Sequence, residues 1–145
     1  MNNYRNILLA INFDEEAPQL LKRAVQRARI EGAALSIIHV DQSVNSTLFE
    51  GFMDLDTLCG HEDEEFFKES ISNMKELVAQ SDYPIKNRLI CSGELGDEIS
   101  SIVQSYEIDL LIMGHHVSSR FRQLFIAACE PLVRKMPCDL LLLRL

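Results

Sequence analysis

Five short apolar segments, separated by stretches with helical spacing, are the feature that most constrains the fold of this chain. Each segment is an almost unbroken apolar run, which is typical of a parallel strand covered on both faces. Strands that alternate with helices predict an α/β fold, a single doubly wound parallel sheet with helices on both faces, Rossmann-like in architecture. The five expected strands span residues 6–13, 34–40, 87–91, 109–113 and 139–145.

The stretches between these strands carry apolar stripes at three- and four-residue spacing, the pattern of a helix that buries one face. For the first helix we expect Asp14 as the N-cap and Gly32 as the left-handed C-cap. Pro131 is tolerated only in a first turn, so the last helix is expected to begin near Ala127 or Ala128. The stripes of the first three helices are Ala17, Leu20, Leu21, Ala24, Val25 and Ala28, then Phe67, Ile71, Met74 and Val78, then Ile99, Ile102, Val103 and Tyr106.

Residues 42–60 have no clear helix or strand period, although they are rich in apolar side chains. Long loops in compact domains are often functional or pack against another surface. We therefore expect the apolar side chains of this segment to cover an edge of the sheet or a partner subunit. These side chains are Leu48, Phe49, Phe52, Met53, Leu55 and Leu58.

The length and charge of the chain exclude several classes of protein. A chain of 145 residues is the size of one domain, and we expect a single domain over residues 1–145. The 14 basic and 22 acidic residues give a net charge of −8, which repels phosphate backbones and anionic lipid. We therefore expect neither nucleic acid nor a membrane as a partner.

The four cysteines, Cys59, Cys91, Cys129 and Cys138, never stand in the C-x-x-C spacing of zinc or thioredoxin-type redox sites. The first apolar run is too short for a signal peptide, and no run approaches the roughly 18 apolar residues of a membrane span. Reduced thiols and a cytoplasmic location are the expectation.

Several motifs in a fixed order resemble those of the universal stress proteins. They are N-I-L-L-A-I-N (6–12), S-I-I-H-V-D (36–41), S-G-E-L-G-D-E-I (92–99), D-L-L-I-M-G-H-H (109–116) and P-C-D-L-L-L-L (137–143). The segment L-F-E-G-F-M-D (48–54) and the histidine pair at 115 and 116 are similar to the A type of this family. The resemblance implies a five-stranded sheet of order 3-2-1-4-5. It also implies a non-enzymatic role in survival under growth arrest, oxidative stress or DNA damage.

Family members that bind ATP carry G-x2-G-x9-G-[ST] after the fourth strand, where backbone amides and a helix N-terminus hold phosphates. In this chain Gly114 fills the first position, but Val117, Ala127 and Ala128 occupy the other three. Asn12 stands where those relatives have aspartate. We therefore expect no bound cofactor, as the A type also implies. A nucleotide-binding (ATP or AMP) switch or weak ATPase with a non-standard phosphate loop remains the alternative. If the remnant pocket is occupied, its lining is expected to be Asn12, Val40, Gly114, His115 and His116.

The histidines could form a metal or proton-handling site with Cys91, because His39, His115 and His116 lie near strand ends. However, the second and fourth strands are not neighbours in the implied order, and two adjacent histidines cannot both point inward from an extended segment. A structural, hydrogen-bonded role is favoured. There is also no G-x-S-x-G nucleophile motif. We expect no catalytic residue and no metal.

The closing segment, residues 139–145, is apolar on both faces and forms an edge strand in the implied order. An uncovered apolar edge is an aggregation hazard, and pairing with a second copy would remove it. A two-fold axis makes that pairing antiparallel. We expect a homodimer, besides protein partners that the sequence does not identify. The expected interface residues are Leu140, Leu141, Leu142, Leu143 and Leu145.

Overall fold

A computed structural model describes residues 3–13, 15–41, 52–55, 67–92, 95–115 and 138–144. The helix expected to begin near residue 127 lies outside these residues. The strands are β1 (Asn6–Ile11), β2 (Ala34–Val40), β3 (Phe52–Asp54), β4 (Ile85–Cys91), β5 (Leu110–His115) and β6 (Asp139–Arg144). The helices are α1 (Ala17–Glu31), α2 (Lys68–Ala79) and α3 (Leu95–Ser105).

The sheet has the order β3-β4-β2-β1-β5-β6, and every neighbouring pair except β3 and β4 is parallel. Its five parallel strands therefore confirm the doubly wound topology and the order 3-2-1-4-5. The number of strands was wrong, because the sheet has six strands and not five. The additional strand, β3, pairs antiparallel with the second half of β4.

Strand β3 comes from the segment without a period, and only tertiary contacts define it. Three residues are too few to carry a strand period. Met53 and the following Leu55 are buried. The carboxylate of Asp54 accepts a hydrogen bond from the hydroxyl of Tyr106 at 3.1 Å. The expectation that this segment covers a sheet edge is confirmed for Met53 and Leu55, and the rest of its apolar side chains lie outside the described part.

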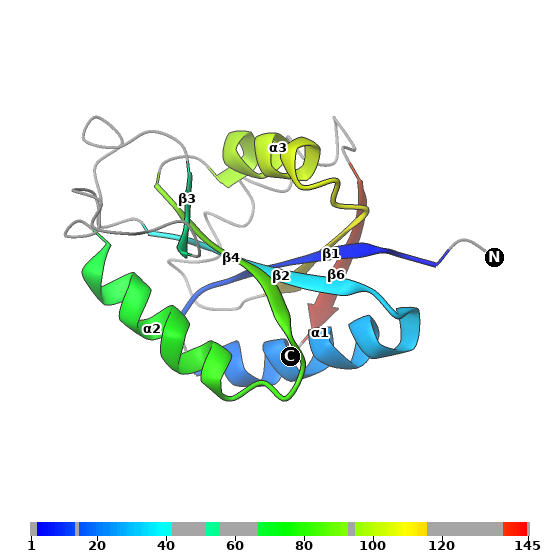
Figure 1. The fold of residues 1–145 in the computed structure, drawn as a ribbon, viewed down its shortest axis with the longest axis horizontal. Helices are drawn as coiled ribbons and strands as arrows, with labels where there is room; N and C mark the ends of the chain where they lie inside the picture. Colours follow the sequence, from blue (N-terminus) through cyan, green and yellow to red (C-terminus); the bar gives the residue numbers. More distant parts are fainter. Residues whose placement is uncertain are drawn as a thin grey trace.

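The helices form a layer on each face of the sheet (Figure 1). Helices α1 and α2 lie on one face and α3 lies on the other. Odd-numbered β1 residues such as Leu9 pack in the core under α1 and α2, and even-numbered ones such as Leu8 pack under α3. This alternation of apolar residues to both faces is why the strands read as continuous apolar runs.

The helix stripes are confirmed over α1, whose buried residues are the six expected ones. Its N-cap is Glu16 and not Asp14, because Pro18 lies in the first turn and thereby fixes the start of the helix. Gly32 is the left-handed C-cap, with φ of 67°. In α2, Ile71 and Met74 are buried as expected, together with Leu77.

Several strand boundaries also differ from those expected. β1 ends at Ile11 rather than at Phe13, and β4 begins at Ile85 rather than at residue 87. β5 spans Leu110–His115 instead of 109–113. Just before it, the carboxylate of Asp109 accepts the backbone N–H groups of Arg5 and Asn6, at 2.8 and 3.0 Å. These contacts fix the amino ends of the strands. The carboxyl ends of the strands lie at the opposite end of the sheet, which is where ligands bind in such folds.

Candidate functional site

His39 lies at the carboxyl end of β2, opposite Ile11 of β1, and its side chain is buried. Its Nδ1 is 3.1 Å from the carbonyl oxygen of Ile11. Because a carbonyl oxygen only accepts, Nδ1 is the protonated nitrogen that donates. The ring of Phe13 covers the imidazole, with the ring centroids 4.1 Å apart. These contacts give His39 the structural, hydrogen-bonded role that the sequence favoured.

Burial lowers the pKa of His39, and the hydrogen bond to Ile11 and the nearby carboxylate of Asp41 only partly offset this effect. Desolvation disfavours the charged imidazolium, so the ring is neutral at neutral pH. A neutral ring covered by Phe13 offers no positive charge to an anionic ligand.

Asp41 follows β2 and turns its carboxylate into the protein. The backbone N–H of Asp41 donates to the carbonyl of Cys91 at 2.7 Å. The hydroxyl of Ser70, on α2, donates to Oδ2 of Asp41 at 2.6 Å, and both side chains are buried. Asp41 therefore fastens the ends of β2 and β4 to α2. Sequence reasoning missed this contact, because 29 residues separate its partners and no local pattern links them.

The expected pocket residues lie along one end of the sheet, since β1 pairs with β2 on one side and with β5 on the other. Asn12 follows β1, and its carboxamide oxygen accepts the backbone N–H of Phe13 at 3.1 Å. Val40 is the last residue of β2, and Gly114 is a buried residue of β5. Only the backbone of His115 is described, at the end of β5.

Other residues of the expected site lie outside the described residues. They are His116 and the three phosphate-loop positions, Val117, Ala127 and Ala128. Of the expected pocket residues, Asn12 is described with a side-chain contact. The positions of Val40, Gly114 and His115 follow from the strands to which they belong. Because β1 separates β2 from β5, His39 and His115 come from strands that are not adjacent, as expected.

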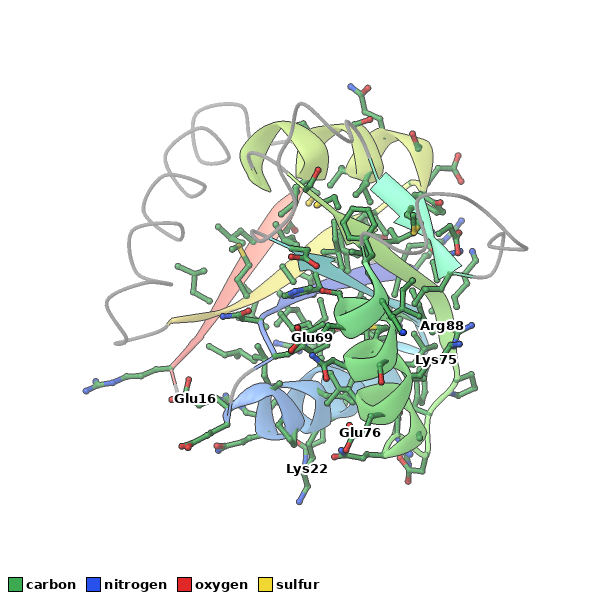
Figure 2. All side chains as sticks on the ribbon, turned by 90° about the vertical axis from the view of Figure 1, so that its left-hand side faces the viewer. Glu16, Lys22, Glu69, Lys75, Glu76 and Arg88 are labelled. Carbon is green, nitrogen blue, oxygen red and sulfur yellow. The ribbon has the colours of Figure 1, made fainter. Side chains whose placement is uncertain are left out.

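Carboxylates from two helices lie near this end of the sheet. Figure 2 looks onto the carboxyl ends of the strands and shows Glu16 at the start of α1 and Glu69 at the start of α2. A helix N-terminus favours an anion, but Glu16, the N-cap of α1, and Glu69, in the first turn of α2, already place a carboxylate at each of these helix starts. The local charge therefore disfavours a phosphate group.

The described residues contain no group of three or more His, Cys, Asp and Glu side chains that could hold a metal ion. Cys91 and Cys138 are reduced and do not take part in a disulfide. Burial, with a smaller contribution from Asp139, raises the pKa of Cys138 to about 11. Its thiol is therefore protonated at neutral pH, which makes it a poor nucleophile and metal ligand.

A small hollow of about 190 Å³ lies between the start of α1 and α2. Its wall combines apolar side chains with two amides and one carboxylate, and no pattern in the sequence predicted it. The lining residues are Phe13, Ala17, Pro18, Asn73, Glu76, Leu77 and Gln80.

The expected interface strand, β6, is at an edge of the sheet, with β5 as its one paired neighbour among the described strands. Leu142 is 44% exposed, whereas Leu143 is buried. Leu140 and Leu141 are half-buried, and Leu145 lies outside the described residues. Among the residues that the structure describes, no helix has the length and apolar character that crossing a membrane requires.

The sequence model described as the universal stress protein family matches residues 3–144. The match covers nearly the whole chain and includes the strands that form the site. This chain belongs to the universal stress protein family.

Two relatives carry the name of the A type. A universal stress protein A homolog from Haemophilus influenzae is 39% identical over 113 residues, which are 78% of this chain and 78% of the relative. Universal stress protein A from Salmonella typhi is 31% identical over 142 residues, which are 98% of this chain and 95% of the relative. The resemblance to the A type is therefore confirmed.

Solved structures agree with the fold. A universal stress protein from Lactobacillus plantarum has a TM-score of 0.63 at 20% identity, covering 99% of this chain and 100% of its own. A universal stress protein solved in complex with cAMP has a TM-score of 0.60 at 17% identity, covering 99% of this chain and 98% of its own. At these identities the similarity concerns the fold alone.

Proposed function

We propose that this protein is a non-enzymatic stress-response protein that acts as a homodimer. It supports survival under growth arrest, oxidative stress or DNA damage by binding protein partners. The functional unit is one domain over residues 1–145, acting in the cytoplasm, where free thiols such as those of Cys91 and Cys138 persist. The net charge of −8 disfavours nucleic acid and anionic lipid as partners.

The observation that carries this proposal is the sequence of the phosphate loop. Val117 and Ala127 replace two glycines whose missing side chains let backbone amides approach a phosphate. Ala128 replaces the residue that would supply a hydroxyl. In a loop with these three side chains, Val117 and Ala127 keep the backbone amides away from a phosphate, and the hydroxyl donor is missing.

The contacts at the sheet end support the same conclusion. The carboxamide oxygen of Asn12 already accepts a backbone N–H, the ring of Phe13 covers His39, and the carboxylate of Asp41 accepts the Ser70 hydroxyl. These side chains satisfy one another within the protein. Because Asn12, Phe13, His39 and Asp41 offer phosphate no positive charge, binding and hydrolysis of a nucleotide are both disfavoured.

A nucleotide-binding switch, or weak ATPase with a non-standard loop, is the second candidate. The relative solved with cAMP favours it, since that protein has the same fold. For this chain, the candidate requires backbone donors outside the glycine pattern. The two candidates therefore differ in one measurable quantity, the affinity for nucleotide.

Calorimetric titration of the purified protein with ATP, AMP and cAMP tests the proposal. The expected result is no binding tighter than roughly millimolar, which corresponds to about −4 kcal/mol. A micromolar dissociation constant for any of the three would establish the second candidate instead. The matched control is Val117→Gly with Ala127→Gly and Ala128→Ser, which restores the family pattern and should bind ATP more tightly than the parent.

The same preparations test the absence of catalysis. A screen for phosphatase and nucleotidase turnover should give rates equal to those of the buffer. Turnover that disappears in His115→Ala or His116→Ala would show that the protein is an enzyme.

A further inference from the structure

The hollow between α1 and α2 combines an apolar base with a polar rim. Ala17 of α1 and Leu77 of α2 are 3% and 5% exposed, and the ring of Phe13 beside them is half-buried. The polar side chains of the lining are more exposed and stand at the rim. They are Asn73, Glu76 and Gln80, all from one face of α2.

We propose that this hollow is the anchor site for a protein partner, and that it holds the side chain of one arginine of that partner. The inference rests on the function proposed above, in which the protein acts by binding partners. It adds the place on the surface where a partner is recognised and the chemistry of the recognition.

The volume of the hollow suits a single side chain rather than a cofactor. Pockets for small molecules and cofactors enclose roughly 300–1,000 Å³, whereas this hollow has about 190 Å³. In protein–protein interfaces a few residues that fill small pockets supply most of the binding energy, and they are most often tryptophan, tyrosine or arginine. The hollow is therefore of the size that one such anchor residue fills.

The rim favours arginine among these three anchors. Glu76 supplies a carboxylate, whose two oxygens match the parallel N–H groups of a guanidinium. The carboxamide oxygens of Asn73 and Gln80 can accept further N–H groups. Tryptophan or tyrosine would bring one donor each and would leave the charge of Glu76 without a cation.

The carboxylate of Glu76 is available for this contact. Among the described residues, the two ion pairs use the carboxylates of Glu31 and Asp82, and Glu76 takes part in neither. Lys22 and Lys75 are labelled together with Glu76 in Figure 2, but neither lysine lines the hollow. The negative charge at the rim is therefore left for a cation from outside.

The end of α2 also favours a positive charge at this place. α2 ends at Ala79 with Gln80 as its C-cap, so the hollow lies against its last turn. The carbonyl groups of a last helical turn carry a partial negative charge that a cation stabilises. α2 has no basic residue in this turn, and an arginine of a partner would supply the missing charge. On the opposite wall, the start of α1 carries a carboxylate of its own, that of the N-cap Glu16.

The apolar base suits the rest of an arginine side chain. The methylene groups of arginine pack along apolar surface while the charged head stays at the rim. A guanidinium is also attracted to the face of an aromatic ring within about 6 Å, which Phe13 offers. Phe13 already packs on His39, with the ring centroids 4.1 Å apart, so this wall exists before a partner binds.

The charge of the whole chain points to the same kind of partner. A net charge of −8 attracts basic proteins over long distances and speeds their association. This general attraction does not depend on any one carboxylate, whereas the anchor site depends on Glu76. The test therefore has to separate the two.

Titration with short peptides, followed by NMR of the backbone amides, tests the anchor site. The probe is a blocked peptide of four alanines around one central arginine, and the control peptides carry lysine or the uncharged citrulline in its place. The arginine peptide should shift the signals of Phe13, Leu77 and Gln80 with a dissociation constant on the order of millimolar. The lysine peptide should bind more weakly because it lacks paired donors, and the citrulline peptide most weakly.

Two matched substitutions on α2 test the role of Glu76. Glu76→Gln removes the charge and keeps the shape, and it should raise the dissociation constant of the arginine peptide on the order of tenfold. Glu69→Gln makes the same change of charge at the start of α2, outside the hollow, and should bind the peptide as the parent does (Figure 2). Both residues are exposed, so both variants should fold as the parent does.

Three outcomes would overturn the anchor site. One is the absence of shifts at the lining residues with tens of millimolar of the arginine peptide. Another is equal affinity in the parent and in Glu76→Gln, which would leave only general attraction by an acidic surface. The third is tighter binding of free spermidine at the same residues, which would make the occupant a small polyamine and not a protein.

This test and the nucleotide titration fail independently of each other. Micromolar binding of ATP, AMP or cAMP would overturn the proposed function, whatever the peptide does. A protein that binds neither nucleotide nor the arginine peptide would keep the proposed function and lose the anchor site in the hollow.

Discussion

At the end of β2, two polar side chains are turned into the protein. His39 and Asp41 are 6% and 7% exposed. Burying a polar group is costly unless a hydrogen bond replaces the lost water, and each of these residues has such a bond. Burial of His39 makes the stability of the protein depend on pH, because the buried imidazole stays uncharged in the folded state.

We expect the free energy of unfolding to decrease as the pH falls below about 6.5, the ordinary pKa of histidine. The unfolded chain then takes up a proton that folded His39, with its lowered pKa, does not. The loss from this residue is at most about 1.4 kcal/mol per pH unit and ends at the pKa of the folded state. Urea unfolding of the parent and of His39→Asn, between pH 7.5 and 5.5, measures it.

His39→Asn keeps a side-chain N–H donor near Ile11 but does not titrate. The parent should therefore lose more stability than the variant over this pH range. The other histidines are present in both proteins, so their effect cancels in the difference. Equal losses in the two proteins would contradict a lowered pKa of His39.

At the scale of the element, α1 shows how a single backbone conformation ends a helix. Gly32 has a φ of 67°, and the following Ala33 donates its N–H to the carbonyl of Ala28 at 2.9 Å. This left-handed residue turns the chain from α1 into β2. Arg29, in the last turn, also forms an ion pair with Asp82 at 2.6 Å.

Gly32→Ala should lower the free energy of unfolding by about 1 kcal/mol. A Cβ at this position would meet no atom within 4 Å, so the cost is the left-handed backbone alone. Gly32→Asn should cost less, because asparagine tolerates this conformation. The control Gln26→Ala, at an exposed position within α1, should have little effect. Denaturant unfolding measures all three, and a neutral Gly32→Ala would contradict the assignment of strain.

The elements could be predicted from the sequence where local patterns define them. The five parallel strands appeared as apolar runs, and the buried residues of α1 followed from their spacing alone. β3 could not be predicted, because its three residues form a strand only through pairing with β4 and packing of Met53 against the core. The start of α1 was predicted at Asp14 because an acidic residue is a common N-cap. Pro18 was the better signal, because proline is favoured in the first turn of a helix, and the N-cap is Glu16.

The candidate site was predictable only in its location. The rule that ligands bind beyond the carboxyl ends of the strands identified Asn12, Val40 and Gly114. The contacts that fill this end, between Phe13 and His39 and between Ser70 and Asp41, depend on how segments far apart in the sequence pack. No spacing of residues encodes them.

At the scale of the whole molecule, alternate residues of β6 direct their backbone N–H groups to β5 or to the open side of the sheet. Substitutions at the two kinds of position should therefore affect folding and dimerisation separately. Asp139 donates its N–H to the carbonyl of Asp109, next to β5, at 3.3 Å. Successive residues of a strand direct their backbone groups to opposite sides, so Leu141 directs its N–H to β5 and Leu142 directs its N–H to the open side. Proline removes this donor in either case. We expect Leu142→Pro to remain folded and to become monomeric.

The matched variant Leu141→Pro should lose stability, because it breaks a hydrogen bond between β5 and β6. Sedimentation velocity and thermal unfolding of both variants distinguish the two effects. If Leu142→Pro remained dimeric, β6 would not form the interface.

The antiparallel strand β3 also bears on how many subunits the proposed homodimer could recruit. In the language of polymer chemistry, a monomer with two reactive ends grows into chains, whereas a monomer with one stops at the dimer. β3 occupies the second half of the β4 edge. Lys86 lies in the first half and Pro84 directly precedes the strand, and both residue types oppose strand pairing. Among the described strands, β3 and β6 are the two edges of the sheet, and β3, with three residues, offers a much shorter edge than β6 with six. If two copies join through β6, we expect only the short β3 edges to remain open, and edges of three residues are poor starting points for a fibre.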